Sequence, residues 1–212
     1  MTFLRLALAL FLTTTLVLGA AETAPMPATA PAVTAWMSWE GGVDLACMTK
    51  PGLTQPNLIL HVARIVHTPV GSAPSGMVVY QPDPAAAPAV FGFICEQPAV
   101  GAYFGPNVFA GTPFEKAPVL PAKITITTTA DTASSRIEAG GHVFTVTLSG
   151  LAATQLVNRA AGAMPFHYLG VESAASTVAV TIDGKPVEVI VPPPHPVNGP
   201  AAAFAQTGLY AR

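Results

Sequence analysis

Residues 142–162, HVFTVTLSGLAATQLVNRAAG, contain the clearest local pattern in the chain, and the fold prediction starts from them. Phe144, Val146 and Leu148 alternate with more polar neighbours. A period of two is typical of a strand with one face on a core and the other toward solvent. The first half of this stretch therefore predicts a half-buried strand.

The second half of the same stretch changes to the period of a helix. Apolar residues recur at the i, i+3, i+4, i+7 spacing of one helix face, and polar residues occupy the other. Ser149 can cap the first turn, whereas Gly162 and Pro165 suit its end. We therefore expect one amphipathic helix at about 150–161.

Several other stretches around this one have strand character. Residues 57–67 are rich in Leu, Ile and Val, and residues 122–129 alternate isoleucine with threonine. In residues 177–191, TVAVTIDGKPVEVIV, the Asp183-Gly184 pair suits a two-residue type I′ hairpin turn. The predicted fold class is mainly β, an antiparallel β-sandwich or rolled sheet with one amphipathic helix.

The N-terminus has the pattern of an export signal. Arg5 precedes an apolar run and then small residues, which predicts a signal peptide at 1–21 that is cleaved after Ala21. The run is too short to span a membrane, so we expect no membrane insertion after cleavage and a periplasmic or extracellular protein. A Pro/Ala/Thr-rich leader at 22–35 follows.

The remaining chain is expected to form one domain. Its predicted parts are a single β-rich domain at 36–191 and a Pro-rich C-terminal tail at 192–212. Charged residues make up only 9% of the chain, against about 25% in ordinary soluble domains. With no cluster of Lys or Arg, a nucleic-acid partner is excluded, and a protein or small ligand remains as the expected partner.

The chain contains two cysteines, Cys47 and Cys95. In an oxidising compartment such a pair is most simply a disulfide, and the long separation does not fit a CxxC redox or metal motif. The prediction is a Cys47–Cys95 disulfide, with two buried free thiols as the alternative.

No catalytic motif is present. The sequence lacks GxSxG, SxxK, HExxH, GxGxxG and the phosphate-binding GxxxxGK[ST]. We therefore expect a non-catalytic binding, envelope or interaction module without a cofactor, and an enzyme would show itself by a pocket that holds convergent polar groups. Aromatic residues in loop-like sequence suggest a candidate binding surface of Trp36, Trp39, Tyr103, Phe104, Phe109 and Phe114.

Metal binding is the first alternative to this interpretation. Histidine and methionine suit copper or zinc in an exported protein, and the residues considered are His61, His67, Met37 and Met48. On one strand, His61 and His67 would lie about 20 Å apart, so they could not share a metal without ligands from elsewhere. The main prediction therefore includes no metal site.

Two family resemblances provide a further alternative, a surface or assembly protein. The stretch 42–47, GVDLAC, and the near-terminal Tyr210 resemble chaperone–usher pilins, which implies a strand supplied by a neighbouring subunit. An early tryptophan before the first cysteine and the strand 144–151 resemble proteins of the invasion-associated protein B type. Concentration-dependent polymerisation would distinguish the pilin-like alternative, and metal content the metal carrier.

Overall fold

A computed structural model describes residues 32–162, 164–194 and 199–212. The predicted signal peptide, the leader as far as residue 31 and residues 195–198 of the predicted tail lie outside the described residues. Residues Val33–Arg212 form one compact unit.

Strands dominate the part of the chain that the structure describes. In chain order the elements are β1 (Trp36–Cys47), β2 (Leu58–Thr68), β3 (Gly71–Tyr80), β4 (Val90–Cys95), α1 (Pro98–Tyr103), the π-helical turn η1 (Phe104–Val108), β5 (Val119–Thr128), β6 (Thr132–Ala139), β7 (His142–Leu151), β8 (Gln155–Arg159), β9 (His167–Ile182), β10 (Lys185–Val187) and β11 (Ala202–Ala211).

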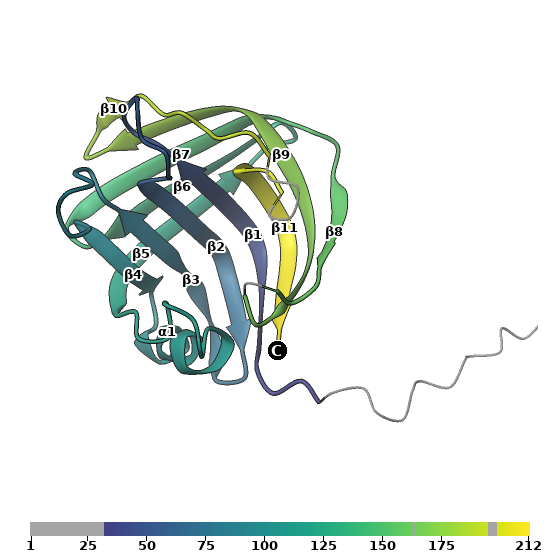
Figure 1. Cartoon of the computed structure of the whole chain (residues 1–212). Coiled ribbons are helices and arrows are strands. Elements are labelled where there is room, and N and C mark those ends of the chain that lie inside the picture. Colours follow the sequence, from purple (N-terminus) through teal and green to yellow (C-terminus); the bar gives the residue numbers. More distant parts are fainter. Residues whose placement is uncertain (1–31, 163, 195–198) are drawn as a thin grey trace, which may run out of the picture. The chain divides into compact units, whose positions relative to one another are not determined.

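The strands form one sheet that closes on itself. Its order is β10-β9-β11-β1-β2-β3-β4-β5-β6-β7, and β7 also pairs with β9. Closure depends on the length of β9, because its first half pairs with β11 and its second half with β7. Figure 1 shows β1 to β4 and β11 in front, with β5 to β7 crossing behind them.

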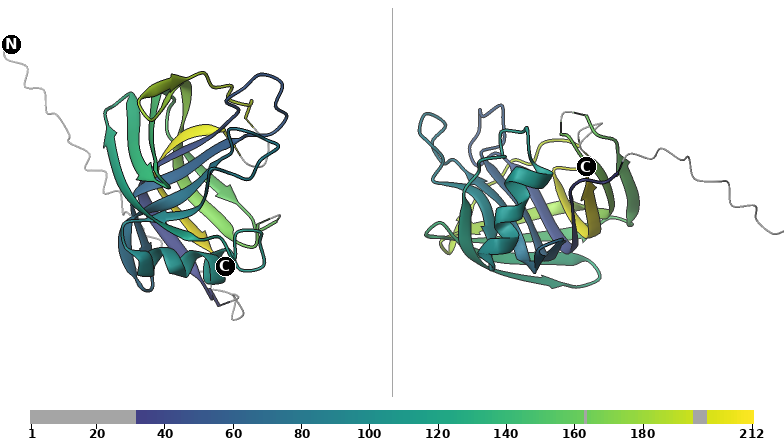
Figure 2. Two further views of the ribbon diagram at one scale, coloured as in Figure 1. Left: turned by 90° about the vertical axis from the view of Figure 1, so that its left-hand side faces the viewer. Right: turned by 90° about the horizontal axis from the view of Figure 1, so that it is seen from below.

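The main hydrophobic core lies between these front and back layers, which Figure 2 shows from two further sides. It includes Val43 and Leu45 of β1, Leu60 of β2 and Phe144 of β7, all without accessible surface. Because strand residues alternate between faces, the neighbours of these residues in the front strands point to the opposite side of the sheet.

A second apolar cluster covers part of that opposite side. Met37 and Trp39 of β1 pack there with Phe93 of β4 and with Phe104 of η1. The α1–η1 segment lies across the ends of the front strands in Figure 1. Among the described residues, no helix is long and apolar enough to cross a membrane.

The predicted fold class is confirmed as a mainly β protein with a rolled sheet and a short helical segment. The strand at β7 and the β9–β10 hairpin are also as expected, with φ of 53° at Asp183 and 75° at Gly184 in the turn. The sheet is mixed rather than purely antiparallel, because β4 and β5 pair in parallel.

The position of the predicted helix is wrong. Within 150–161 the chain forms strand β8, which pairs with residues Tyr168 to Glu172 of β9. Leu156, expected on the buried helix face, is 75% exposed. A short helix gains most of its stability from packing an apolar face, and the edge of β9 offers backbone partners in its place. The helical segment lies at 98–108 instead and includes Tyr103 and Phe104, which we expected in loop-like sequence.

The predicted C-terminal tail also differs from the structure. Its residues Ala202–Ala211 form β11, a central strand between β1 and β9. The segment AAAFAQTGLYA is rich in Ala and Gly, which have low strand propensity, so its sequence carries a weak signal. These small side chains suit a strand that is covered on both faces.

The predicted Cys47–Cys95 disulfide is wrong, because both cysteines are free and buried. Cys47 belongs to the main core and Cys95 to the second cluster, so they lie on opposite faces of the sheet. Strands β2 and β3 also separate β1 from β4. Neighbouring strands lie about 4.8 Å apart, so three such spacings together exceed the Cα separation that a disulfide can bridge.

Candidate functional site

A cavity of about 690 Å³ lies on the face of the front strands that is turned away from the main core. Most of its lining is apolar, including Met37, Ile59, Met77, Phe109 and Phe166. Polar side chains gather in part of the lining: Asp44, His61, Arg159, Tyr168, Glu172 and Tyr210. An apolar cavity with a few convergent polar groups is the usual form of a small-molecule site.

An irregularity in the front strands determines which side chains reach this cavity. Trp39 and Asp44 of β1 both line it, although residues five apart in a regular strand face opposite sides. Between them Gly41 has φ of 65°, which glycine adopts without strain. At the same level the pairing register shifts between β2 and β3 and between β11 and β9. The shift in alternation brings both side chains to one face.

Asp44 and His61 form a pair across two neighbouring strands. They are register partners in β1 and β2, and Nδ1 of His61 lies 3.0 Å from Oδ1 of Asp44. The His61 side chain is 48% accessible because it lines the cavity. Burial alone would lower the pKa of His61, but the hydrogen bond and charge of Asp44, with the charge of Glu172, raise the pKa above its usual value.

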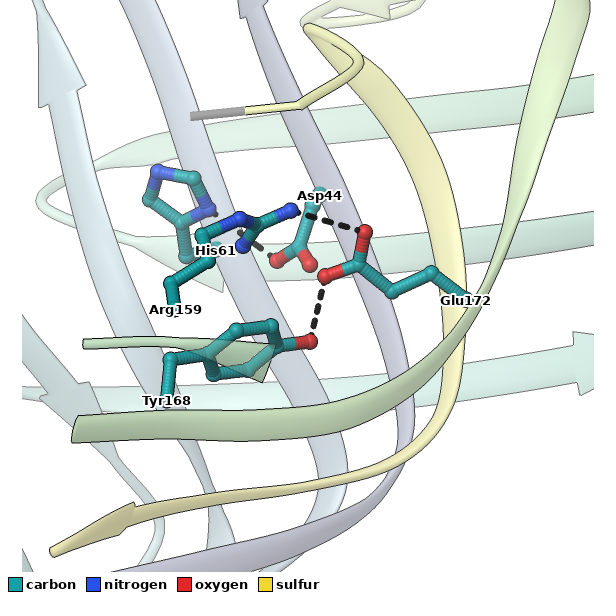
Figure 3. Close-up of polar contacts among 5 residues, drawn as sticks. All are labelled: Asp44, His61, Arg159, Tyr168 and Glu172. Atoms are coloured by element: carbon teal, nitrogen blue, oxygen red, sulfur yellow. Dashed lines mark hydrogen bonds and ion pairs between the residues drawn. The ribbon is translucent and has the colours of Figure 1, made fainter. Parts of the chain in front are cut away.

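A second polar group is centred on Glu172 of β9, whose side chain is only 7% accessible. Nη2 of Arg159 donates to Oε2 of Glu172 at 3.1 Å, and the Tyr168 hydroxyl donates to Oε1. Figure 3 shows Arg159 and Tyr168 converging on this carboxylate, with Asp44 and His61 beside them. Burial, followed by the hydrogen bond and charge of Glu172, raises the pKa of Tyr168, so this phenol keeps its proton.

Strand β8 is what brings Arg159 into the site. Arg159 is the register partner of Tyr168, and Gln155 is the partner of Glu172. The guanidinium carbon lies 4.6 Å from the centre of the Tyr168 ring, a cation–π arrangement. A helix at this position would not pair Arg159 with Tyr168 in a strand register. The strand β8, which replaces the predicted helix, therefore completes the site.

Two glycines make room for the aromatic rings beside the polar groups. Trp39 stacks on Tyr168 with ring centres 5.8 Å apart, and Tyr210 meets Trp39 edge-on at 4.7 Å. A Cβ at Gly208 would lie 2.2 Å from the Trp39 ring, and one at Gly170 would lie 2.1 Å from the Tyr168 hydroxyl. Gly208 and Gly170 are register partners, so together they form a depression in the sheet that the two rings fill.

The structure brings together part of the aromatic surface predicted from the sequence. Trp39, Phe104, Phe109 and Phe114 line the cavity. Trp36 and Tyr103 lie outside the lining and meet each other, because the Trp36 backbone N–H donates to the Tyr103 hydroxyl at 3.4 Å.

The polar residues were largely missed from the sequence. His61 appeared only as an alternative metal ligand, and Asp44, Arg159, Tyr168 and Glu172 were not singled out. They come from β1, β8 and β9, so only the pairing of strands shows that they converge. The available signal was glycine inside strand-like sequence, in HYLGV and QTGLY, which indicates close packing against a side chain.

The alternative metal ligands are not brought to one place. His61 and Met37 line the cavity, but His67 lies beside Ser38 in the register of β1 and β2 and contacts Ser72 and Glu40. Met48 pairs through its backbone with Ile190. Among the described residues, no three His, Cys, Asp or Glu side chains converge as metal ligands.

No family model and no curated protein matches this chain. Among solved structures, an acetoacetate decarboxylase from Legionella pneumophila aligns at 12% identity and a TM-score of 0.34, over 88% of this chain and 90% of that chain. A second acetoacetate decarboxylase structure aligns at 10% identity and a TM-score of 0.30, over 84% of each chain. At these scores neither alignment assigns a role to any residue.

The prediction of a non-catalytic binding, envelope or interaction module is corrected, together with its metal-carrier, pilin-like and invasion-associated-protein-B-like alternatives. The finding that overturns it is the cavity, which holds the convergent polar groups by which we expected an enzyme to be recognised.

Proposed function

We propose that this protein is an enzyme that binds a small, largely apolar molecule in the cavity and transfers a proton through the imidazole of His61. The observation that carries the proposal is the His61–Asp44 pair beside an aromatic wall. Because Nδ1 of His61 is engaged by Asp44, Nε2 is the ring nitrogen that remains for a bound molecule.

The two residues have different parts in this chemistry. When His61 is neutral and donates from Nδ1 to Asp44, its Nε2 carries the lone pair and can act as a base. The raised pKa of His61 increases its basicity, and the Asp44 carboxylate stabilises the imidazolium that forms. Asp44 therefore positions the ring and does not itself remove the proton in this scheme.

The remaining groups shape the site around His61. Glu172 is held by Arg159 and Tyr168, which fixes the wall next to the Trp39 ring. An apolar molecule bound against this lining would displace water and so strengthen the electrostatic interactions inside. The described lining contains neither lysine nor cysteine, so covalent catalysis by an amine or a thiol is not part of this proposal.

The test uses nitrobenzisoxazole, a planar apolar probe of a positioned base. Removal of its ring C–H proton by a base breaks the N–O bond and gives a coloured cyanophenolate. We expect the wild-type protein to open this ring faster than free imidazole at the same concentration, with a rate that increases with pH as His61 loses its proton. His61→Gln should reduce the rate to background without unfolding the protein.

The chain supplies a matched control in His142, which contacts Asp183 at 2.9 Å outside the cavity lining. His142→Gln removes a similar His–Asp pair and should leave the rate unchanged. Equal rates for wild type and His61→Gln, or no wild-type rate above free imidazole, would contradict the proposal.

We also propose that the protein acts outside the cytoplasm, on the basis of the signal-peptide pattern at residues 1–21. An intact mass of the protein produced with its own N-terminus should correspond to a chain that begins at Glu22. Recovery of only the uncleaved chain from the cytoplasm would contradict this.

A further inference from the structure

The charges around the cavity leave its polar part negative or neutral. Asp44 and Glu172 supply two carboxylates, whereas Arg159 supplies one guanidinium. His61 adds a positive charge only when protonated. With His61 neutral, the net charge of these four side chains is therefore −1, and a ligand enters a field that favours positive charge.

Arg159 is committed to the protein rather than to a ligand. Its Nη2 donates to Glu172 at 3.1 Å and its guanidinium lies over the Tyr168 ring. A Cβ placed on Gly199 would lie 2.4 Å from the same Nη2, so backbone also packs closely against this nitrogen. Its side chain is 25% accessible. A ligand carboxylate that approaches this cation would therefore meet the like charge of Glu172 beside it.

Asp44 presents the opposite situation. Its Oδ1 accepts from His61, and Oδ2 has no partner among the residues that the structure describes. The Asp44 side chain remains 26% accessible and lines the cavity. A carboxylate that retains a free acceptor inside an apolar cavity is suited to a donor that the ligand brings.

Aromatic rings share the cavity with this carboxylate. Trp39, Tyr168 and Tyr210 all line it, and Arg159 already lies over the Tyr168 ring. Ring faces attract cations through their quadrupole, and Trp and Tyr do so most strongly. The carboxylate, together with Trp39 and Tyr210, therefore forms the kind of environment that binds an alkylammonium group.

We propose that the ligand of this cavity carries an amine, bound as its ammonium ion beside Asp44, on an apolar body that packs against the phenylalanine-rich wall. The inference rests on the proposed function in so far as the cavity is the ligand site. It adds the ligand's charge and chemical class, and it predicts that carboxylates are bound poorly.

The electrostatics at the site agree with this assignment. The pKa of Tyr210 is raised by burial and then by the charge of Asp44, although Arg159 opposes the shift. The titratable groups that share the cavity lining with His61 come from four strands: Asp44 of β1, Arg159 of β8, Tyr168 and Glu172 of β9, and Tyr210 of β11. Because an ammonium ion and a proton on His61 both compete for Asp44, the affinity for an amine should increase as pH rises through the His61 pKa.

Calorimetry with matched probes tests the inference. Phenylpropylamine, phenylpropanol and phenylpropanoate share an apolar body and differ in head-group charge. At pH 8 we expect the amine to bind at least about tenfold more tightly than the carboxylate, with the alcohol between them. Asp44→Asn should remove most of this preference, whereas Asp183→Asn, in the His–Asp pair outside the lining, should retain it.

Equal affinities, a preference for phenylpropanoate, or no binding of the amine would overturn the inference. The neutral nitrobenzisoxazole probe separates this failure from failure of the proposed function. His61-dependent turnover without amine preference would leave the enzyme proposal standing and refute only the charge assignment. Amine preference without His61-dependent turnover would refute only the proton-transfer proposal.

Discussion

The two faces of the front strands have different tasks, although their residues alternate along the same chain. On β2, Leu60 lies in the main core without accessible surface, and the next residue, His61, lines the cavity. On β1, Val43 and Leu45 likewise lie in the main core, and Asp44 between them in sequence lines the cavity. The comparison teaches that one residue of a strand can stabilise the core while the next residue serves the cavity, because a strand sends alternate side chains to opposite sides.

The largest effect is expected from the core face. Leu60→Ala should lower the free energy of unfolding by about 2–5 kcal/mol, because it removes buried methyl groups and leaves a cavity. Urea denaturation followed by circular dichroism measures this. His61→Gln is the neighbouring control on the other face and should change the unfolding free energy by less than about 1 kcal/mol. Similar losses in both variants would show that the faces are not separate.

A smaller effect is expected from the depression under the aromatic rings. Gly208→Ala should cost about 1–3 kcal/mol, because its Cβ would overlap the Trp39 indole and force it to move. In a Trp36→Phe background the emission of Trp39 should change as well. Gly162→Ala, where a Cβ meets nothing within 4 Å, is the control. Unchanged stability and emission in Gly208→Ala would mean that the ring does not lie over this glycine.

The polar pair should affect stability less and in a pH-dependent way. The folded-state pKa of His61 is raised, so its contribution is present below the unfolded pKa of about 6.5 and is lost as pH rises through the folded value. Asp44→Asn should therefore destabilise the protein near pH 6 and have little effect near pH 9. Because about half of the His61 side chain is accessible to solvent, we expect a difference under about 1 kcal/mol, measured by urea denaturation at both pH values. A pH-independent difference would contradict the coupling.

The reactivity of the two cysteines tests the same difference between the two faces without a change in stability. Burial raises the pKa of the Cys47 thiol to about 12, so at pH 8 almost none of the reactive thiolate is present. Iodoacetamide should leave Cys47 unmodified in the folded protein and alkylate it after unfolding, as peptide mass spectrometry would show. A Cys47–Cys95 cross-linked peptide under non-reducing conditions would contradict the placement of these residues on opposite faces.

Local pattern was sufficient for the elements that carry their own signal. The alternation in β7 and the Asp183-Gly184 turn between β9 and β10 depend on neighbours in sequence, and both were predicted. At β8 the local pattern favoured a helix, but the unpaired edge of β9 determined the structure. In β11 the strand signal was weak, because alanine and glycine have low strand propensity. These small residues fit a strand that is covered on both faces.

The site was harder to predict than the fold. His61 and Asp44 meet because β1 and β2 pair in one particular register, and Trp39 joins them because the alternation shifts near Gly41. Periodicity within one strand cannot report a register between strands. Aromatic density did identify Phe104, Phe109 and other members of the wall, since large rings gather wherever an apolar cavity is lined.

The most direct test of the two-face account is an NMR titration of the isotope-labelled protein with phenylpropanol, the neutral apolar probe that the proposed reaction does not consume. Signals from the His61 ring and from the Met37 and Met77 methyl groups should shift in a saturable manner, because all three residues line the cavity. The methyl signals of Leu60, next to His61 in sequence but in the main core, should remain nearly unchanged. Shifts of Leu60 that equal those of His61, or saturation without any His61 shift, would contradict the account.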